Sequence, residues 1–192
     1  MSISRSRHDR LVRSFASVAG AAVLAMSVAA MTGSCASSPD PLRPTTIVGP
    51  SYNEFKGVGQ QAGVSAFLEK RCATLDCHGQ VGRPLRLYSR TGLRFPDPDV
   101  QNTPGAAGTS EEELLANYQS VIGLEPELMS KLVLDPTNNQ PQSLLLVKKP
   151  RAQERHKGGQ IVVIGDDGDR CVTSWLGGAT DFAACLTAAQ VP

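Results

Sequence analysis

The sequence has few aromatic residues and no strong surplus of charge of either sign. Aromatic residues make up 5% of the 192 residues, and 19 basic residues nearly balance 18 acidic ones. Residues 1–34 hold four of the basic residues and one acidic residue, so the rest of the chain has 15 basic and 17 acidic residues, a net charge of about −2. A chain so near neutrality lacks the basic surface that nucleic acids require. We therefore expect no nucleic-acid partner.

The sequence also lacks the patterns of common catalytic sites. It has no paired carboxylates, no glycine-rich phosphate loop and no recognisable pairing of a nucleophile with a base. The acidic run Glu111–Glu113 is explained by a helix start. The acidic run Asp166–Asp169 is explained by a turn, because it lacks the ligand spacing of a calcium loop. We expect no separate catalytic residues.

Residues 1–34 have the features of an export signal. Arg5–Arg13 is positively charged, Phe15–Met31 is dominated by Ala, Val, Leu and Met, and small residues then precede Cys35. This junction is typical of a bacterial lipoprotein, in which the cysteine is acylated and becomes the new N-terminus. Secretion after cleavage near Ala29–Ser34 and an uncleaved anchor are the alternatives. We expect a protein of the bacterial cell envelope, anchored by lipid on the periplasmic side or in the outer membrane.

A flexible tether rich in proline and serine, 35–50, separates this signal from a folded domain, 51–192. Apolar spacing in that domain predicts four helices, and Ser110 with Glu113 forms a capping box at the start of one of them. The helices are expected at Gly63–Arg71, Ser110–Ile122, Glu127–Leu134 and Asp169–Leu176. Two short apolar runs, Ser143–Val147 and Gln160–Ile164, leave room for a small β-hairpin. The predicted fold is mostly α with long loops.

The most informative segment is Cys72-Ala-Thr-Leu-Asp-Cys77-His78-Gly79. It is a widened form of C-x-x-C-H, the attachment motif of c-type haem. Two thiols can form thioethers with the haem vinyl groups, and the adjacent histidine can bind the iron. The adjacency of Cys77 and His78 matters more than the spacing of the cysteines, because one thioether and the axial bond must meet the same ring. A local disulfide and half of a zinc site are the alternatives.

The chain resembles cytochrome c domains, and in particular the cytochrome c-like lipoproteins of myxobacteria and planctomycetes. The likeness begins with Phe67–Arg71 before the motif and continues downstream of it. The downstream elements are the run Ser143–Leu146, then Lys149-Pro150, then His156-Lys157-Gly158-Gly159, and finally Trp175-Leu176. The resemblance implies a cytochrome c-like helical domain with one covalent haem c, attached through Cys72, Cys77 and His78.

The two remaining cysteines are Cys171 and Cys185. Once lipid occupies Cys35 and haem occupies the two motif cysteines, these two pair without remainder. A disulfide closing this loop would contribute roughly 3 kcal/mol of stability. A second metal site is the competing interpretation, but the chain has only three histidines from which to build it.

The sixth iron ligand has three candidate solutions. Beyond the leader, His156 is the one histidine besides His78, and Met129 is the one methionine. The resemblance favours His156, while Met129 and an open position are the alternatives. Arg151, Arg155 and Lys157 lie near His156 in sequence and are candidates to meet the haem propionates.

These observations predict an electron carrier more readily than an enzyme. The expected partners are the membrane, through the lipid, and a redox protein that the sequence does not specify. A haem sensor or a peroxidase-like protein with an open iron site is one alternative. A haem-free lipoprotein that is stapled by disulfides and acts as an interaction module is another.

Overall fold

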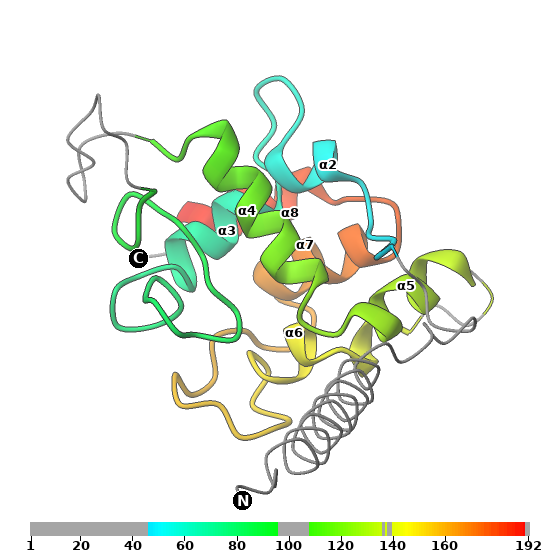
Figure 1. Ribbon diagram of the computed structural model, residues 1–192. Helices are drawn as coiled ribbons and strands as arrows, with labels where there is room; N and C mark the ends of the chain where they lie inside the picture. Colours follow the sequence, from blue (N-terminus) through cyan, green and yellow to red (C-terminus); the bar gives the residue numbers. More distant parts are fainter. Residues whose placement is uncertain (1–45, 96–107, 136, 138–139, 191–192) are drawn as a thin grey trace, which may run out of the picture. The chain divides into compact units, whose positions relative to one another are not determined.

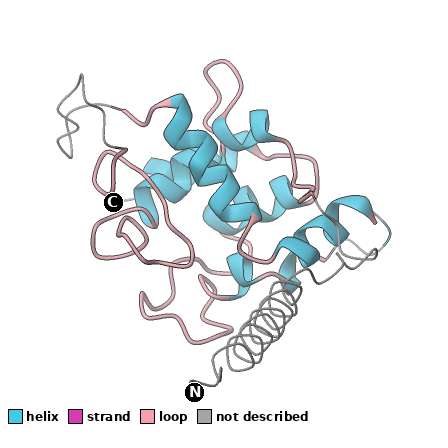
Figure 2. Ribbon diagram, in the orientation of Figure 1, coloured by secondary structure: helices cyan, strands magenta, loops and turns pink. Residues whose placement is uncertain are grey.

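The structure is a computed structural model that describes residues 46–95, 108–135, 137 and 140–190. In these residues helices are joined by long loops, and the β-structure is limited to one isolated bridge between Tyr88 and Leu93 (Figures 1 and 2). The prediction of a mostly α fold is therefore confirmed. The helices are α2 (Tyr52–Lys56), α3 (Val64–Arg71), α4 (Glu111–Ile122), α5 (Pro126–Leu134), α6 (Leu145–Lys148), α7 (Asp167–Leu176) and α8 (Phe182–Gln190), with a 3-10 turn η2 (Pro141–Ser143) before α6.

Each of the four helices predicted from the sequence is present. The capping box at the start of α4 forms as expected, because Ser110 Oγ accepts a hydrogen bond from Glu113 N and Glu113 Oε2 accepts one from Ser110 N. Helix α7 begins two residues earlier than expected. The reason is that Asp166 caps it, with its carboxylate accepting a hydrogen bond from Asp169 N.

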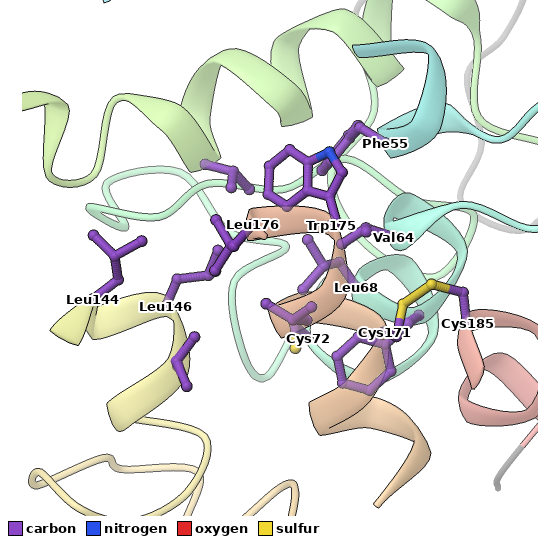
Figure 3. Close-up of a cluster of buried hydrophobic side chains, with 14 of the residues drawn as sticks. Phe55, Val64, Leu68, Cys72, Leu144, Leu146, Cys171, Trp175, Leu176 and Cys185 are labelled. Atoms are coloured by element: carbon purple, nitrogen blue, oxygen red, sulfur yellow. A yellow bond between two sulfur atoms is a disulfide. The ribbon is translucent and has the colours of Figure 1, made fainter. Parts of the chain in front are cut away.

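The core is built around Trp175 of α7, which is fully buried (Figure 3). Phe55 of α2 packs against it with ring centroids 5.4 Å apart, and Tyr118 of α4 lies 5.5 Å from Phe55. The indole N–H donates to the carbonyl of Ser51, so the one polar atom of this side chain is satisfied. Tyr52, Phe55, Tyr118 and Trp175 thus form an aromatic cluster where α2, α4 and α7 meet.

A disulfide between Cys171 and Cys185 joins α7 to α8 (Figure 3). Both cysteines are fully buried, and α8 also packs against α3. The predicted pairing of these two cysteines is therefore present in the structure. It links two helices that both pack against α3, the helix that leads into Cys72.

The hairpin expected from Ser143–Val147 and Gln160–Ile164 is wrong. The first run contains the end of η2 and most of α6, and its Leu144, Leu146 and Val147 are buried in the core. The second run forms no strand, and the N–H groups of Ile161 and Val162 both donate to the carbonyl of Pro150. Leucine favours helix over strand. In a run this short, the packing of its side chains in the core determines the conformation.

The predicted leader, Cys35 and most of the tether lie outside the described residues. Among the residues that are described, no helix combines the length and apolar character needed to cross a membrane.

Candidate haem site

The segment from Cys72 to Gly79 forms a compact turn at the end of α3. The carbonyl of Cys72 accepts a hydrogen bond from His78 N, and the carbonyl of Thr74 accepts hydrogen bonds from Cys77 N and Gly79 N. Gly79 must be glycine, because a Cβ there would lie 2.3 Å from the carbonyl oxygen of Ala73. The four intervening residues are thus folded into the turn, which brings Cys72 and His78 to the same cavity.

Cys72 and Cys77 are free thiols in the structure, so the local disulfide considered for this motif is not formed. Cys72 is buried, and burial, assisted by the nearby Cys77, raises its pKa to about 12. Two neighbouring cavities, described below, adjoin these cysteines. Cys72 lines both cavities, and Cys77 lines the second of them.

His78 is held by the loop that follows it. Its Nδ1 lies 2.8 Å from the carbonyl oxygen of Leu85, and Leu87 N donates to the carbonyl of His78. A carbonyl oxygen only accepts hydrogen bonds, so Nδ1 carries the proton and the neutral ring presents a lone pair at Nε2. Burial lowers the pKa of His78, which favours this neutral, metal-binding form.

His156 is held in the same manner on a different loop. Its Nδ1 lies 2.9 Å from the carbonyl oxygen of Gly159, whose own N–H donates back to the carbonyl of His156. Gly159 has φ +72°, a conformation that favours glycine, and a Cβ on Gly158 would lie 3.1 Å from His156 Cε1. The His-x-Gly-Gly sequence therefore builds a tight turn that leaves Nε2 of His156 without a partner inside the turn.

The rings of His78 and His156 lie close together and are nearly parallel. Their ring centroids are 6.1 Å apart and their planes differ by 11°. Metal–imidazole bonds of about 2 Å, together with the distance from each nitrogen to its ring centre, separate two imidazoles on one metal by about 6 Å. The observed separation thus matches that of two imidazoles that share a metal ion.

An apolar cavity of about 300 Å³ adjoins both histidines. Its wall contains residues of α3, α6 and α7 and the loop residues Pro84 and Leu85, together with the charged residues Lys149 and Asp169. The leucine run that was expected to form a strand therefore contributes to the cavity wall, through Leu145, Leu146 and Val147.

A second cavity of about 300 Å³, which we call the basic mouth, adjoins the first. It shares Cys72, His78 and His156 with the apolar cavity and is lined by four cationic residues against one carboxylate, Asp76. The cationic residues are Arg71, Arg83, Arg155 and Lys157. Arg83 Nε is buried and is the one buried side-chain nitrogen or oxygen in the described part of the chain without a hydrogen-bond partner. A carboxylate bound there would satisfy it.

Two sequence expectations about this region need correction or refinement. Arg151 does not line the mouth, because it forms a buried ion pair with Asp169. Arg155 and Lys157, the other two candidates for the propionates, do line it. Met129, the alternative iron ligand, is buried in the core and does not line either cavity.

Among residues 46–95, 108–135, 137 and 140–190, no three His, Cys, Asp or Glu side chains converge into a metal-binding group. The ligand set that the zinc interpretation requires is therefore not assembled in that part of the chain. Haem iron takes only its axial ligands from the protein, so the pair His78 and His156 is sufficient for it.

Sequence reasoning missed the groups that orient the two histidines. The carbonyls of Leu85 and Gly159 are backbone atoms, and the residue type at a position does not reveal where its carbonyl points. It also missed Pro84, which lines both cavities, and Arg83, which lines the basic mouth. Both residues follow the motif by only a few positions, and this closeness in sequence could have indicated that they lie near the site.

Searches of protein-family models, curated proteins and solved structures found no match to this chain. The assignment of the site therefore depends on its residues and their geometry.

Proposed function

We propose that this protein is a c-type cytochrome that carries electrons through one covalently bound haem. Cys72 and Cys77 form the thioethers, His78 is the proximal iron ligand and His156 is the distal one. The observation that carries the proposal is the pair of near-parallel imidazoles, 6.1 Å apart, beside the C-x4-C-H turn. These two histidines are 78 residues apart in the sequence, so a local motif does not explain why they meet.

The shape and charge of the site support an amphipathic ligand of this kind. Haem has a flat apolar ring and two carboxylates on one edge. The apolar cavity fits the ring, and the basic mouth offers Arg83, Arg155 and Lys157 to the carboxylates. The unpartnered Nε of Arg83 is a further donor for a carboxylate.

The residues of this chain have distinct roles in the proposed function. The two thiols each add across a vinyl double bond, so the ring cannot dissociate. The carbonyls of Leu85 and Gly159 hold both imidazoles in the tautomer that presents Nε2 to the iron. The apolar wall keeps water from the ring, which affects the redox potential.

When bound, haem supplies an iron that accepts and releases one electron. If His78 and His156 both held the iron, they would leave no open position for a substrate, and this favours electron transfer over catalysis. Two imidazole ligands also give a lower potential than a His/Met pair. The proposed function is therefore that of an electron carrier of comparatively low potential.

The leader supports a place in the bacterial cell envelope, with lipid on Cys35 as the anchor. The expected partners are the membrane surface and a redox protein. A Cys35→Ala variant should lose its association with membranes in cell fractionation. Unchanged membrane association of that variant would contradict the lipid anchor.

Covalent attachment is tested by producing the full chain with a c-type cytochrome maturation system. Acid–acetone extraction should leave the colour with the protein, and the mass should increase by one haem. The Cys72→Ala and Cys77→Ala variants should each retain a single thioether, with a shifted pyridine haemochrome spectrum. Complete extraction of the pigment from the wild type would refute thioether attachment.

The distal ligand is tested by a matched pair of variants. His156→Ala should convert a six-coordinate low-spin spectrum to a high-spin one. Met129→Leu should leave the spectrum unchanged, because Met129 lies in the core outside the cavity. The reverse pattern would assign the role to Met129, and an unaltered spectrum in both variants would indicate an open or differently filled position.

A further inference from the structure

The distal histidine lies on a loop with little structure of its own. The segment between α6 and α7, residues 149–166, contains no helix or strand, and most of residues 152–165 is exposed. His156 is near its middle, and its Nδ1 forms a hydrogen bond with the carbonyl of Gly159 in the same loop. The position of His156 relative to His78 therefore depends on the contacts that join the loop to the rest of the domain, among them the buried Val162 and the base of the loop.

A buried ion pair joins the base of this loop to α7. Arg151 Nε donates to Asp169 Oδ1 at 2.6 Å, and Arg151 Nη2 donates to Asp169 Oδ2 at 2.8 Å. The two side chains are only 5% and 6% exposed. Gly165 N, near the far end of the loop, donates to the same Asp169 Oδ2 at 2.8 Å. One carboxylate on α7 thus holds both ends of the loop.

The backbone near Arg151 adds to this arrangement. Pro150 accepts hydrogen bonds at its carbonyl from Ile161 N and Val162 N, which closes the loop. Ala152, the next residue after Arg151, has φ 57°, and it is the one described non-glycine residue with a positive φ. A conformation that costs about 1 kcal/mol or more persists only where the surroundings enforce it. The loop is therefore held in one conformation at the point where Arg151 enters the core.

We infer that the Arg151–Asp169 ion pair is a positioning element that fixes the loop so that His156 meets the iron opposite His78. This inference rests on the proposed function. The bidentate pair sets the orientation as well as the distance of the loop base, because a guanidinium and a carboxylate bind through two parallel hydrogen bonds. Arg151 acts through the loop and not on the haem carboxylates.

A buried ion pair is weak evidence for a role in stability. Replacing both partners by apolar residues of similar volume is often neutral or stabilising. A purely structural pair is thus replaceable by such residues without consequence for His156. A positioning pair is not, because apolar side chains do not fix the direction in which the loop leaves the core.

The test uses the full haem-loaded protein with the double substitution Arg151→Met and Asp169→Leu, and with Arg151→Lys alone, which leaves Asp169 in place in the cavity wall. The control is Arg170→Met, which removes an exposed arginine next to Asp169 that pairs with Asp167 at 2.7 Å and takes no part in the loop. The measured quantities are helix content, covalent haem content, spin state in the visible spectrum and hydrogen exchange at Ile161, Val162 and Gly165.

The double variant should keep wild-type helix and haem content but show a mainly high-spin spectrum, which added imidazole converts back to low-spin. Hydrogen exchange at the three amides should be at least tenfold faster, while the control behaves as wild type. If the double variant does not fold, the same measurements on Arg151→Lys test the positioning role, because lysine keeps the charge but not the bidentate geometry. It should then show a partial loss of the low-spin form.

Two outcomes separate failure of this inference from failure of the proposed function. A double variant, or Arg151→Lys in its place, that stays fully low-spin with unchanged exchange would overturn the positioning role alone. Wild-type protein without covalent haem would overturn the proposed function and, with it, the role of the ion pair toward His156.

Discussion

The packed helices and the two histidine-bearing loops are built in different ways. Around Trp175, α2, α3, α7 and α8 bury their apolar faces against one another, and a disulfide joins the last two (Figure 3). The turn after α3 and the loop 149–166 have no regular structure and are held by backbone hydrogen bonds and one buried ion pair. The first region is held by apolar packing, and the second by polar contacts of defined direction in addition to a few buried apolar residues such as Ala73 and Val162.

We therefore expect the packed helices to determine the stability of the domain and the loops to determine the geometry of the histidine site. Loss of apolar packing lowers the free energy of unfolding in proportion to the buried volume, whereas loss of a directional polar contact changes where a side chain points. Changes in the packed region are therefore expected to alter stability and to leave the spectrum of a folded site unaltered. Changes in the loops are expected to alter the spectrum and to leave the free energy of unfolding nearly unaltered.

The largest effect on stability is expected for Trp175→Ala, a substitution in the packed region. The side chain is fully buried at the meeting point of three helices, so its loss should cost about 3–5 kcal/mol of unfolding free energy. Urea denaturation followed by circular dichroism measures this. A loss below about 1 kcal/mol would show that Trp175 is not the centre of the packed region.

A weaker perturbation of the same region is removal of the disulfide by Cys171→Ser and Cys185→Ser. The entropic model predicts a loss of about 3 kcal/mol, which corresponds to a decrease in Tm of roughly 10 °C for a domain of this size. Thermal denaturation provides the test, with the visible spectrum at 25 °C as the internal comparison. A changed spin state in the folded double variant would show that the disulfide also shapes the histidine site.

Glu69 offers a pH-dependent test on α3, the helix that joins the two regions. Burial raises its pKa to about 7, and although the hydrogen bond from Thr109 opposes this shift, the charge of Glu113 adds to it. Because the folded protein then holds the proton more tightly than the unfolded chain, this group contributes most stability below pH 4.5 and loses it as the pH rises through about 7.

Glu69→Gln should remove that dependence, with an effect on the order of 1–3 kcal/mol between pH 5 and pH 8. Urea midpoints measured across this range check it. Replacement of Glu112, an exposed glutamate at the start of α4, is the control and should retain the wild-type slope. An unchanged slope in Glu69→Gln would show that another group titrates, and the spectrum should stay constant in both variants.

The sequence predicted those parts of the molecule that depend on local pattern. Apolar spacing located α3 and α7, the capping box located the start of α4, and the count of cysteines indicated the Cys171–Cys185 pair. It failed for the run Ser143–Val147, because short apolar segments take their conformation from tertiary packing.

For the site, the sequence named His78 and His156 but not what orients them. The carbonyls of Leu85 and Gly159 and the Arg151–Asp169 pair are contacts whose partners are fixed only once the chain has folded. For the same reason, the sequence predicted that Arg151 would meet the haem carboxylates, because Arg151 is a cation close to His156 in the sequence. In the structure it pairs with Asp169 instead. Side-chain direction in an irregular loop has no periodic signal.

The central claim, that His78 and His156 bind one haem iron, is tested most directly by electron paramagnetic resonance of the oxidised wild-type protein. Parallel axial imidazoles split the energies of the two iron orbitals that interact with them, whereas perpendicular ones leave these orbitals nearly equal. The angle of 11° between the ring planes therefore predicts a rhombic low-spin signal. A high-spin signal, or a low-spin signal of the highly anisotropic kind that perpendicular rings give, would contradict the account.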